Sequence, residues 1–121
     1  MDDTDYYILL RELPKDLKLN NGNCGSFAIA LKEIFGKGEL VGISNGLDGF
    51  VHIFLRIGNG FYDGNGIWRE FQIRDNWLEY IEIIEPISCD DAIEGTMYYL
   101  TFNEMKDIIL GIAQKQNIEL L

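Results

Sequence analysis

The sequence contains few of the residues that separate one folded unit from another. Its 121 residues include only two prolines, Pro14 and Pro86, and there is no internal repeat and no low-complexity stretch. Domain boundaries usually fall in linkers rich in proline, glycine or polar residues, and none is evident here. Because a chain of this length can bury a core without disulfide bonds, we expect a single domain over residues 1–121.

Metal ligands and disulfide partners are equally scarce. The chain has two cysteines, Cys24 and Cys89, and one histidine, His52. The cysteines fit neither the spacing of a disulfide framework nor that of a zinc site, and the many carboxylates do not follow the spacing of a calcium loop. We therefore expect two reduced thiols, no metal and no other cofactor.

Positive charge and long apolar stretches are also missing. The chain has 10 Lys and Arg against 20 Asp and Glu, a formal net charge of −10, which repels nucleic acid and anionic membrane surfaces. No apolar run is long enough to cross a bilayer, and the acidic start MDDTDYY is unlike a secretory signal. The sequence predicts a cytoplasmic protein that binds neither nucleic acid nor membranes directly, and it leaves the oligomeric state open.

The residues that are present suit a packed globule. Hydrophobic residues make up 47% of the chain and aromatic residues 12%, which argues against intrinsic disorder. A run of turn and capping residues ends at Asn23, and apolar residues then recur at spacings of three and four as far as Gly36, which predicts a helix that starts at Cys24. Thr101 and Glu104 form a capping box ahead of a second apolar stripe, which predicts a C-terminal helix.

Between these two helices the pattern is that of strands. Apolar or alternating segments are separated by turn residues, and Gly58-Asn59-Gly60 is typical of a hairpin turn. The acidic segment around Asp90 is expected to be a loop. Together the elements indicate an α+β domain with an antiparallel sheet. The expected strands are residues 39–43, 50–57, 61–63, 67–73, 77–84 and 96–100.

Cys24 stands where a thiol can be activated. A free thiol is mostly protonated at neutral pH, and both a helix N-terminus and a neighbouring imidazolium favour its anion. Gly25 leaves the approach to the sulfur open, and the Cys24 N–H could donate to an oxyanion. Asn20, Asn21 or Asn23 could supply a second donor. Most buried cysteines are structural, so Cys24 alone does not establish a catalytic role.

His52 offers a partner of suitable chemistry on the second strand. Strict alternation over residues 50–57 puts four aliphatic residues on one face and His52 on the other, beside Phe54. A lone histidine on a strand is more often a hydrogen-bonded structural residue than a base. A third group that orients the imidazole would strengthen the catalytic reading.

Asp63 can be that third group only in one register of the hairpin. If Gly58 and Asn59 form the loop, Asp63 lies opposite Phe54 and diagonal to His52. A loop of Asn59 and the following glycine, the more usual Asn-Gly choice, moves Asp63 out of reach. A carboxylate in such a turn is also commonly structural, so the register decides whether a triad can exist.

Three short motifs follow one another along the chain. They are Asn23-Cys24-Gly25-Ser26-Phe27 at a helix start, Val51-His52-Ile53 on a strand, and Phe61-Tyr62-Asp63 followed by Gly64 and Gly66. Their order resembles the catalytic core of the papain-like cysteine protease superfamily, particularly its compact transglutaminase-like bacterial and phage members. The resemblance covers residues 20–66 of the 121.

The resemblance implies roles for the three residues. Cys24 would be the nucleophile, His52 the general base and acid, and Asp63 the group that orients His52, with the cysteine-bearing helix packed on the sheet. Asp63→Asn is then expected to be tolerated, because an amide oxygen can also accept from the ring N–H. The sequence departs from papain in carrying Lys18 where papain has a glutamine, and in being too short for a second lobe.

These observations predict a cysteine hydrolase or transferase that acts on an amide or ester. Peptidase, deamidase and transamidase activities all stay open, and the substrate would be a protein or peptide, a basic one suiting the charge. The alternative is a non-enzymatic acidic inhibitor or nucleic-acid mimic that binds a basic protein partner.

Overall fold

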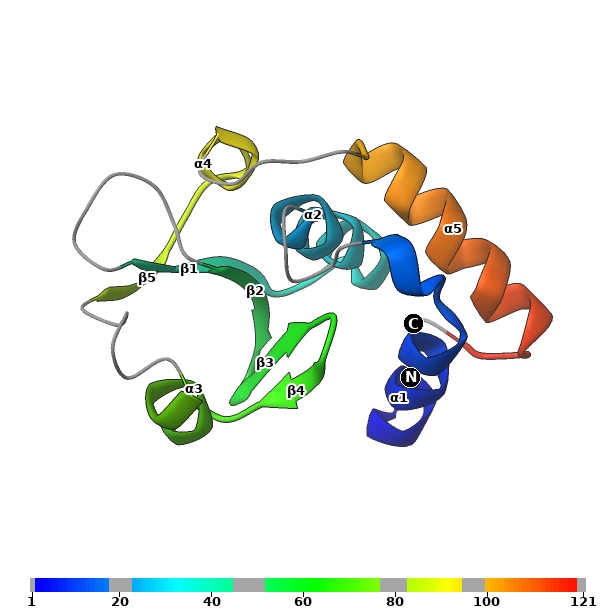
Figure 1. The fold of residues 1–121 in the computed structure, drawn as a ribbon, viewed down its shortest axis with the longest axis horizontal. Coiled ribbons are helices and arrows are strands. Elements are labelled where there is room, and N and C mark those ends of the chain that lie inside the picture. Colours follow the sequence, from blue (N-terminus) through cyan, green and yellow to red (C-terminus); the bar gives the residue numbers. More distant parts are fainter. Residues whose placement is uncertain (1, 18–22, 45–51, 77–82, 95–99, 120–121) are drawn as a thin grey trace.

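The helix that carries Cys24 lies between an antiparallel sheet and a long C-terminal helix (Figure 1). The computed structural model describes residues 2–17, 23–44, 52–76, 83–94 and 100–119. This arrangement confirms the predicted α+β class. The elements are α1 (Asp3–Glu12), the 3₁₀ helix η1 (Lys15–Leu17), α2 (Cys24–Phe35), β1 (Glu39–Ser44), β2 (His52–Ile57), β3 (Gly60–Asp63), β4 (Gly66–Trp68), α3 (Glu70–Asn76), β5 (Ile83–Pro86), α4 (Cys89–Glu94) and α5 (Phe102–Lys115).

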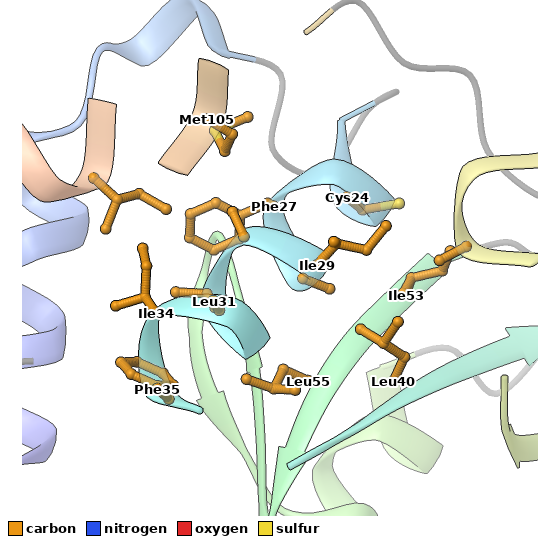
Figure 2. Packing of buried hydrophobic residues seen from close by; sticks show 14 of the residues in the cluster. Cys24, Phe27, Ile29, Leu31, Ile34, Phe35, Leu40, Ile53, Leu55 and Met105 are labelled. Atoms are coloured by element: carbon orange, nitrogen blue, oxygen red, sulfur yellow. The ribbon is translucent and has the colours of Figure 1, made fainter. Parts of the chain in front are cut away.

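The described strands form one sheet in the order β4-β3-β2-β1-β5, and every neighbouring pair is antiparallel. β2 is therefore hydrogen-bonded on both sides, which fixes where its side chains point. Apolar side chains cover both faces of the sheet, and full burial of each large one contributes roughly 1.5–3 kcal/mol. The α2 side includes Phe27, Leu31, Leu40, Ile53 and Leu55 (Figure 2), and the other side Val41, Ile43, Phe54, Phe61 and Ile73.

α2 begins and ends at the predicted residues. Gly36, with a φ of 67°, forms a left-handed C-cap, and its N–H donates to the carbonyl oxygen of Lys32. Glycine adopts this conformation at little cost. At the other end Asn23 is the N-cap residue, but its side chain makes no capping hydrogen bond, and no acidic residue lies in the first turn. The positive end of α2 is therefore not neutralised by the helix's own residues.

α1 adds to the predicted elements, although its signals are present in the sequence. Asp2 caps the helix by accepting from the Asp5 N–H, and Arg11 lies in the last turn. Tyr6 and Leu9, three residues apart, are fully buried. An acidic start with apolar residues at helical spacing is typical of an amphipathic helix.

The prediction of a strand over residues 67–73 is wrong beyond Trp68. β4 ends there, and α3 follows. The reason lies in Gln72, whose side-chain oxygen accepts from the N–H of Arg69, the residue before the helix, as in a capping box. Ile73 then points into the second apolar cluster and is fully buried.

The predicted loop around Asp90 is also wrong, because these residues form α4. Ser88 is the missed signal. Its hydroxyl accepts from the Asp91 N–H and its carbonyl from the Ala92 N–H, and a serine followed by acidic residues favours a helix start. Ala92 is fully buried in the cluster that contains Cys24, so α4 packs on the same core as α2.

Three of the predicted strands, those over residues 50–57, 77–84 and 96–100, lie partly outside the described residues. β5 confirms the end of the strand predicted over residues 77–84, with Pro86 as its last residue rather than the residue that follows it. Residues 50–51, 77–82 and 96–99 are not among those described, so these parts of the three strands stay predictions.

Thr101→Ala tests the capping box of α5. The Thr101 hydroxyl accepts from the Glu104 N–H at 3.2 Å, and the Glu104 carboxylate accepts from the Thr101 N–H at 3.3 Å. We expect this substitution to lower the free energy of unfolding, measured by urea denaturation, by about 1 kcal/mol. Thr4→Ala, at an exposed position of α1, is the control and should change it by less than about 0.5 kcal/mol. Equal losses in both variants would contradict a stabilising cap.

Candidate active site

Cys24 is the first residue of α2, and its sulfur lies at the start of that helix (Figure 2). Only 4% of the residue is exposed. Asn23 Nδ2 donates to the Leu17 carbonyl at 2.6 Å, and Asn23 Oδ1 accepts from the Leu100 N–H at 3.1 Å. Ser26 Oγ donates to the Leu100 carbonyl at 2.8 Å. Segments before and far after α2 are thus tied to the turn that carries the thiol.

The β2–β3 hairpin adopts the register that brings Asp63 toward His52. Its strand pairing leaves Gly58 and Asn59 as the two loop residues. Gly58 has a φ of 58°, the conformation that a type II′ turn requires at its first central position. Counting on along the paired strands sets Asp63 opposite Phe54. The register needed by the predicted triad is confirmed.

His52 and Asp63 meet through a short hydrogen bond between two buried side chains. His52 Nε2 lies 2.8 Å from Asp63 Oδ2, and 3% and 2% of the two residues are exposed. The imidazole also packs edge-on against Phe54, with ring centroids 4.7 Å apart and planes at 85°. The ring is therefore held by a carboxylate and by an aromatic ring.

The Cys24 thiol is another hydrogen-bond partner of the imidazole. Strand alternation assigns His52 to the Phe54 face, whereas α2 packs on the opposite face. Cys24 is the first residue of α2, and His52 is the first described residue of β2, so the two side chains meet beside the N-terminus of that helix. With Nε2 engaged by Asp63, Nδ1 is the nitrogen that can exchange a proton with the thiol. The three residues predicted to be catalytic thus form one series of contacts.

Asp63 is held by hydrogen bonds to both of its carboxylate oxygens. Oδ1 accepts from the N–H groups of Asn65 at 2.9 Å and Gly66 at 3.1 Å, and from Trp68 Nε1 at 2.8 Å. Oδ2 faces His52. A buried carboxylate is stabilised when donors surround it. The group therefore has a fixed orientation, with one oxygen for the turn and the other for the imidazole.

The surroundings of His52 favour its protonated form. Burial lowers its pKa, because the charged ring loses water. The hydrogen bonds to Asp63 and Cys24, and the charges of both groups, act in the opposite direction and raise the pKa of His52 from 6.5 to about 9. At neutral pH the ring is therefore an imidazolium, with Asp63 as its counter-ion. An imidazolium beside a thiol favours a thiolate nucleophile.

The predicted oxyanion donors have different surroundings. Asn20 and Asn21 lie outside the described residues. Asn23 is described, and its amide is bonded to the two main-chain segments on either side of the helix start. Gly25 is buried in the first turn, where its N–H, like that of Cys24, has no helical carbonyl to bond. The helix start therefore has main-chain N–H groups without helical partners, as the predicted oxyanion donors require.

Three side chains that hold the site were not predicted from the sequence. They are Tyr6, Ser26 and Trp68, whose hydrogen-bond partners lie 57, 74 and 5 residues away along the chain. Ser26 belongs to the cysteine motif, but nothing in the motif indicates its partner. Two of these contacts join distant segments, so no local pattern could have reported them.

The second thiol lies apart from this arrangement. Cys89 is exposed at the start of α4, whereas Cys24 is buried, and neither forms a disulfide. Among the residues described, no three His, Cys, Asp or Glu side chains gather as a metal site requires. The candidate chemistry therefore centres on Cys24.

The fold and the site together define an α+β domain with a buried Cys-His-Asp arrangement at a helix N-terminus. The chain belongs to the family described as Phage YunG-like protein, whose profile matches residues 10–109. No curated protein and no solved structure gives a significant match. The matched segment contains all three residues of the candidate site.

The raised pKa of His52 predicts that the folded state loses stability as pH rises from about 6.5 to about 9. In the unfolded chain the imidazole has its ordinary pKa, so the folded state binds the proton more tightly and unfolding in this window releases it. The bound proton contributes at most roughly 3 kcal/mol to the free energy of unfolding. This contribution is complete below pH 6.5 and is lost as the pH passes 9. Urea denaturation at a series of pH values measures it.

Two variants serve as controls for this pH dependence. His52→Gln should flatten it, because the titrating group is gone. Cys89→Ser removes an exposed thiol from outside the site and should leave it unchanged. A parent protein whose stability is constant or rises over the same window would contradict the assignment of a buried imidazolium.

Proposed function

We propose that this protein is a compact papain-like thiol enzyme that transfers acyl groups from an amide or ester. The observation that carries the proposal is the series of contacts from Cys24, at a helix N-terminus, through His52 to Asp63. The helix end and the imidazolium both favour a thiolate, and the buried carboxylate fixes the ring. The family description names no reaction, so the site's geometry is the support.

The proposed reaction uses only groups that are already in place. The Cys24 thiolate attacks the carbonyl carbon, which forms an S–C bond and a tetrahedral oxyanion. The oxyanion collapses, the bond to the leaving amine or alkoxide breaks, and that group takes the proton from His52. Water or an amine then attacks the thioester, His52 accepts its proton, and Cys24 leaves as the thiolate. Hydrolysis, deamidation and transamidation differ in the substrate and in the second nucleophile.

The same helix end can stabilise the oxyanion. The N–H groups of Cys24 and Gly25 lie in the first turn of α2, where no helical carbonyl pairs with them. Donors that are fixed in advance stabilise a developing negative charge without reorganising. The hydrogen bonds of Asn23 and Ser26 to Leu100 hold this turn in place, which supports such a role.

The charge of the chain bears on its substrate and location. Since Asp and Glu outnumber Lys and Arg by 20 to 10, a basic protein or peptide is the substrate that best complements the surface. A reactive free thiol suits the reducing cytoplasm. Among the described helices, none has both the length and the apolar character needed to cross a membrane.

The acidic inhibitor or nucleic-acid mimic would use the same charge without the thiol. Its binding to a basic partner should weaken steeply with added salt and should ignore alkylation of Cys24. A thiol enzyme should be silenced by that alkylation and be less sensitive to salt. Alkylation of Cys24 therefore distinguishes the two hypotheses.

Cys24 should react faster than Cys89 with iodoacetamide, a small neutral alkylating reagent, at about pH 6. Solvent exposure alone would make Cys89 the faster of the two, because Cys24 is only 4% exposed whereas Cys89 is exposed. A faster Cys24 therefore reports thiolate character rather than access. We expect a difference of about tenfold or more, scored by peptide mass for each cysteine after exposure to limiting reagent.

Two controls accompany this measurement. His52→Ala should slow Cys24 to the rate of Cys89 or below, because the imidazolium is removed. Denaturant should bring the two rates together, because both local environments are lost. If Cys89 reacts first in the folded protein, or if Cys24 keeps its rate in His52→Ala, the proposed thiolate–imidazolium pair does not exist.

The structure changes the expectation for Asp63→Asn. Asp63 Oδ1 faces three N–H donors, and Oδ2 faces the protonated His52 ring. An amide NH₂ would therefore meet a donor in either orientation. We expect Asp63→Asn to slow Cys24 alkylation about as much as Asp63→Ala does, and to lower the free energy of unfolding by roughly 1–3 kcal/mol.

Asp107→Asn is the matched control, because it removes one carboxylate from an exposed position of α5. It should change neither the alkylation rate nor the urea denaturation curve appreciably. An Asp63→Asn protein that kept both properties of the parent would show that the carboxylate does not hold the imidazole as described.

A further inference from the structure

Two neighbouring tyrosines of α1 hold the turn that carries Asp63. The Tyr6 hydroxyl donates to the main-chain carbonyl of Asp63 at 2.7 Å, and the Tyr7 hydroxyl accepts from the Ile67 N–H at 3.1 Å. The turn is thus bonded at both ends to consecutive residues of one helix. Neither tyrosine belongs to the segment that matches the family profile.

Tyr7 also lies close against the turn, at Gly66. A Cβ atom added to Gly66 would lie 2.7 Å from the Tyr7 hydroxyl oxygen and 2.8 Å from its Cε1. The Gly66 N–H is also one of the donors to Asp63 Oδ1, at 3.1 Å. A residue in contact with α1 therefore takes part in orienting the carboxylate.

Tyr6 is placed so that its hydroxyl acts on the main chain and leaves the carboxylate to His52. The residue is fully buried, and its ring packs edge-on against Tyr62, with centroids 5.0 Å apart. Burial and the charge of Asp63 raise the pKa of Tyr6 well above 10. The hydroxyl therefore remains a neutral donor throughout the range in which His52 titrates.

We propose that Tyr6 is a positioning residue for the Cys24 site, and that the docking of α1 fixes the main chain at Asp63 so that its Oδ2 meets His52 Nε2. The path consists of three hydrogen bonds: from Tyr6 to the Asp63 carbonyl, from Asp63 Oδ2 to the ring, and from the ring to the Cys24 thiol. Because hydrogen bonds weaken steeply with distance and misalignment, a small shift of the turn reaches the thiol. The predicted effect on reactivity rests on the proposed function, whereas the effect on the His52 proton does not.

Tyr6→Phe tests this proposal by removing the hydroxyl and keeping the ring. Since His52 is the chain's only histidine, its imidazole resonance in NMR can be assigned without ambiguity and titrated directly. We expect proton affinity at His52 to fall about three- to tenfold in this variant, with a similar slowing of Cys24 alkylation at neutral pH. A purely structural role for Tyr6 would change the melting temperature without moving the titration.

Two controls are matched to this substitution. Tyr62→Phe removes a hydroxyl from the ring that packs on Tyr6, and among the described residues that hydroxyl has no hydrogen-bond partner; the His52 titration should not move. Ile109→Val trims a fully buried side chain of α5 and should lower the melting temperature without moving the titration. If either control changed the pKa of His52, that pKa would be following the overall stability of the fold, and the proposal would be overturned.

Tyr7→Phe provides a second test that spares the core, because Tyr7 is 48% exposed. Tyr7→Phe should also lower the proton affinity of His52, by a smaller factor than Tyr6→Phe. If Tyr6→Phe does not fold, Tyr7→Phe alone tests whether α1 positions the site. A His52 titration equal to that of the parent in every folded variant of this pair overturns the proposal. If the parent protein has an unreactive Cys24 while Tyr6→Phe still lowers the pKa of His52, that result supports the role of Tyr6 and overturns only the proposed enzyme.

Discussion

The hydrogen bond between His52 and Asp63 depends on one choice of hairpin register, and the rest of the site depends on that bond. With Gly58 and Asn59 as the loop, the two side chains are diagonal neighbours, and 2.8 Å separates Nε2 from Oδ2. A loop one residue later would carry Asp63 two positions further along β2, about 6–7 Å away. Gly58 makes the observed loop favourable, because its φ of 58° suits a glycine-first turn.

A buried ion pair of this kind is unfavourable unless each charge finds enough partners. Asp63 meets the condition with three N–H donors besides the imidazole. For His52, the attraction of its neighbours exceeds the loss of hydration, since its pKa rises although the ring is buried. The pair is therefore more than a local contact: removing either member leaves an uncompensated charge in the core. This explains why Asp63→Asn is expected to lower both the reactivity of Cys24 and the free energy of unfolding.

The parts of the structure that the sequence predicts correctly are those with local signals. The start of α2 at Cys24, the left-handed cap at Gly36 and the capping box at Thr101 each depend on residues within four positions of one another. Ser88 carries the same kind of local signal, because its hydroxyl accepts from the Asp91 N–H and caps α4. The contact of Tyr6 with the Asp63 carbonyl spans 57 residues, and it follows from the packing of α1, which no local pattern reports.

Asn23 shows how the local and the tertiary requirements conflict at this site. It occupies the N-cap position of α2, yet its side chain bonds to Leu17 and Leu100 and leaves the helix uncapped. Loss of a side-chain cap costs a helix about 1 kcal/mol, which two hydrogen bonds to the main chain can offset. A capping oxygen would occupy N–H groups of the first turn, the groups that the proposed reaction requires for its oxyanion. Local helix stability is thus given up where the proposed chemistry would use a positive helix end, and functional sites commonly depart from local rules in this way.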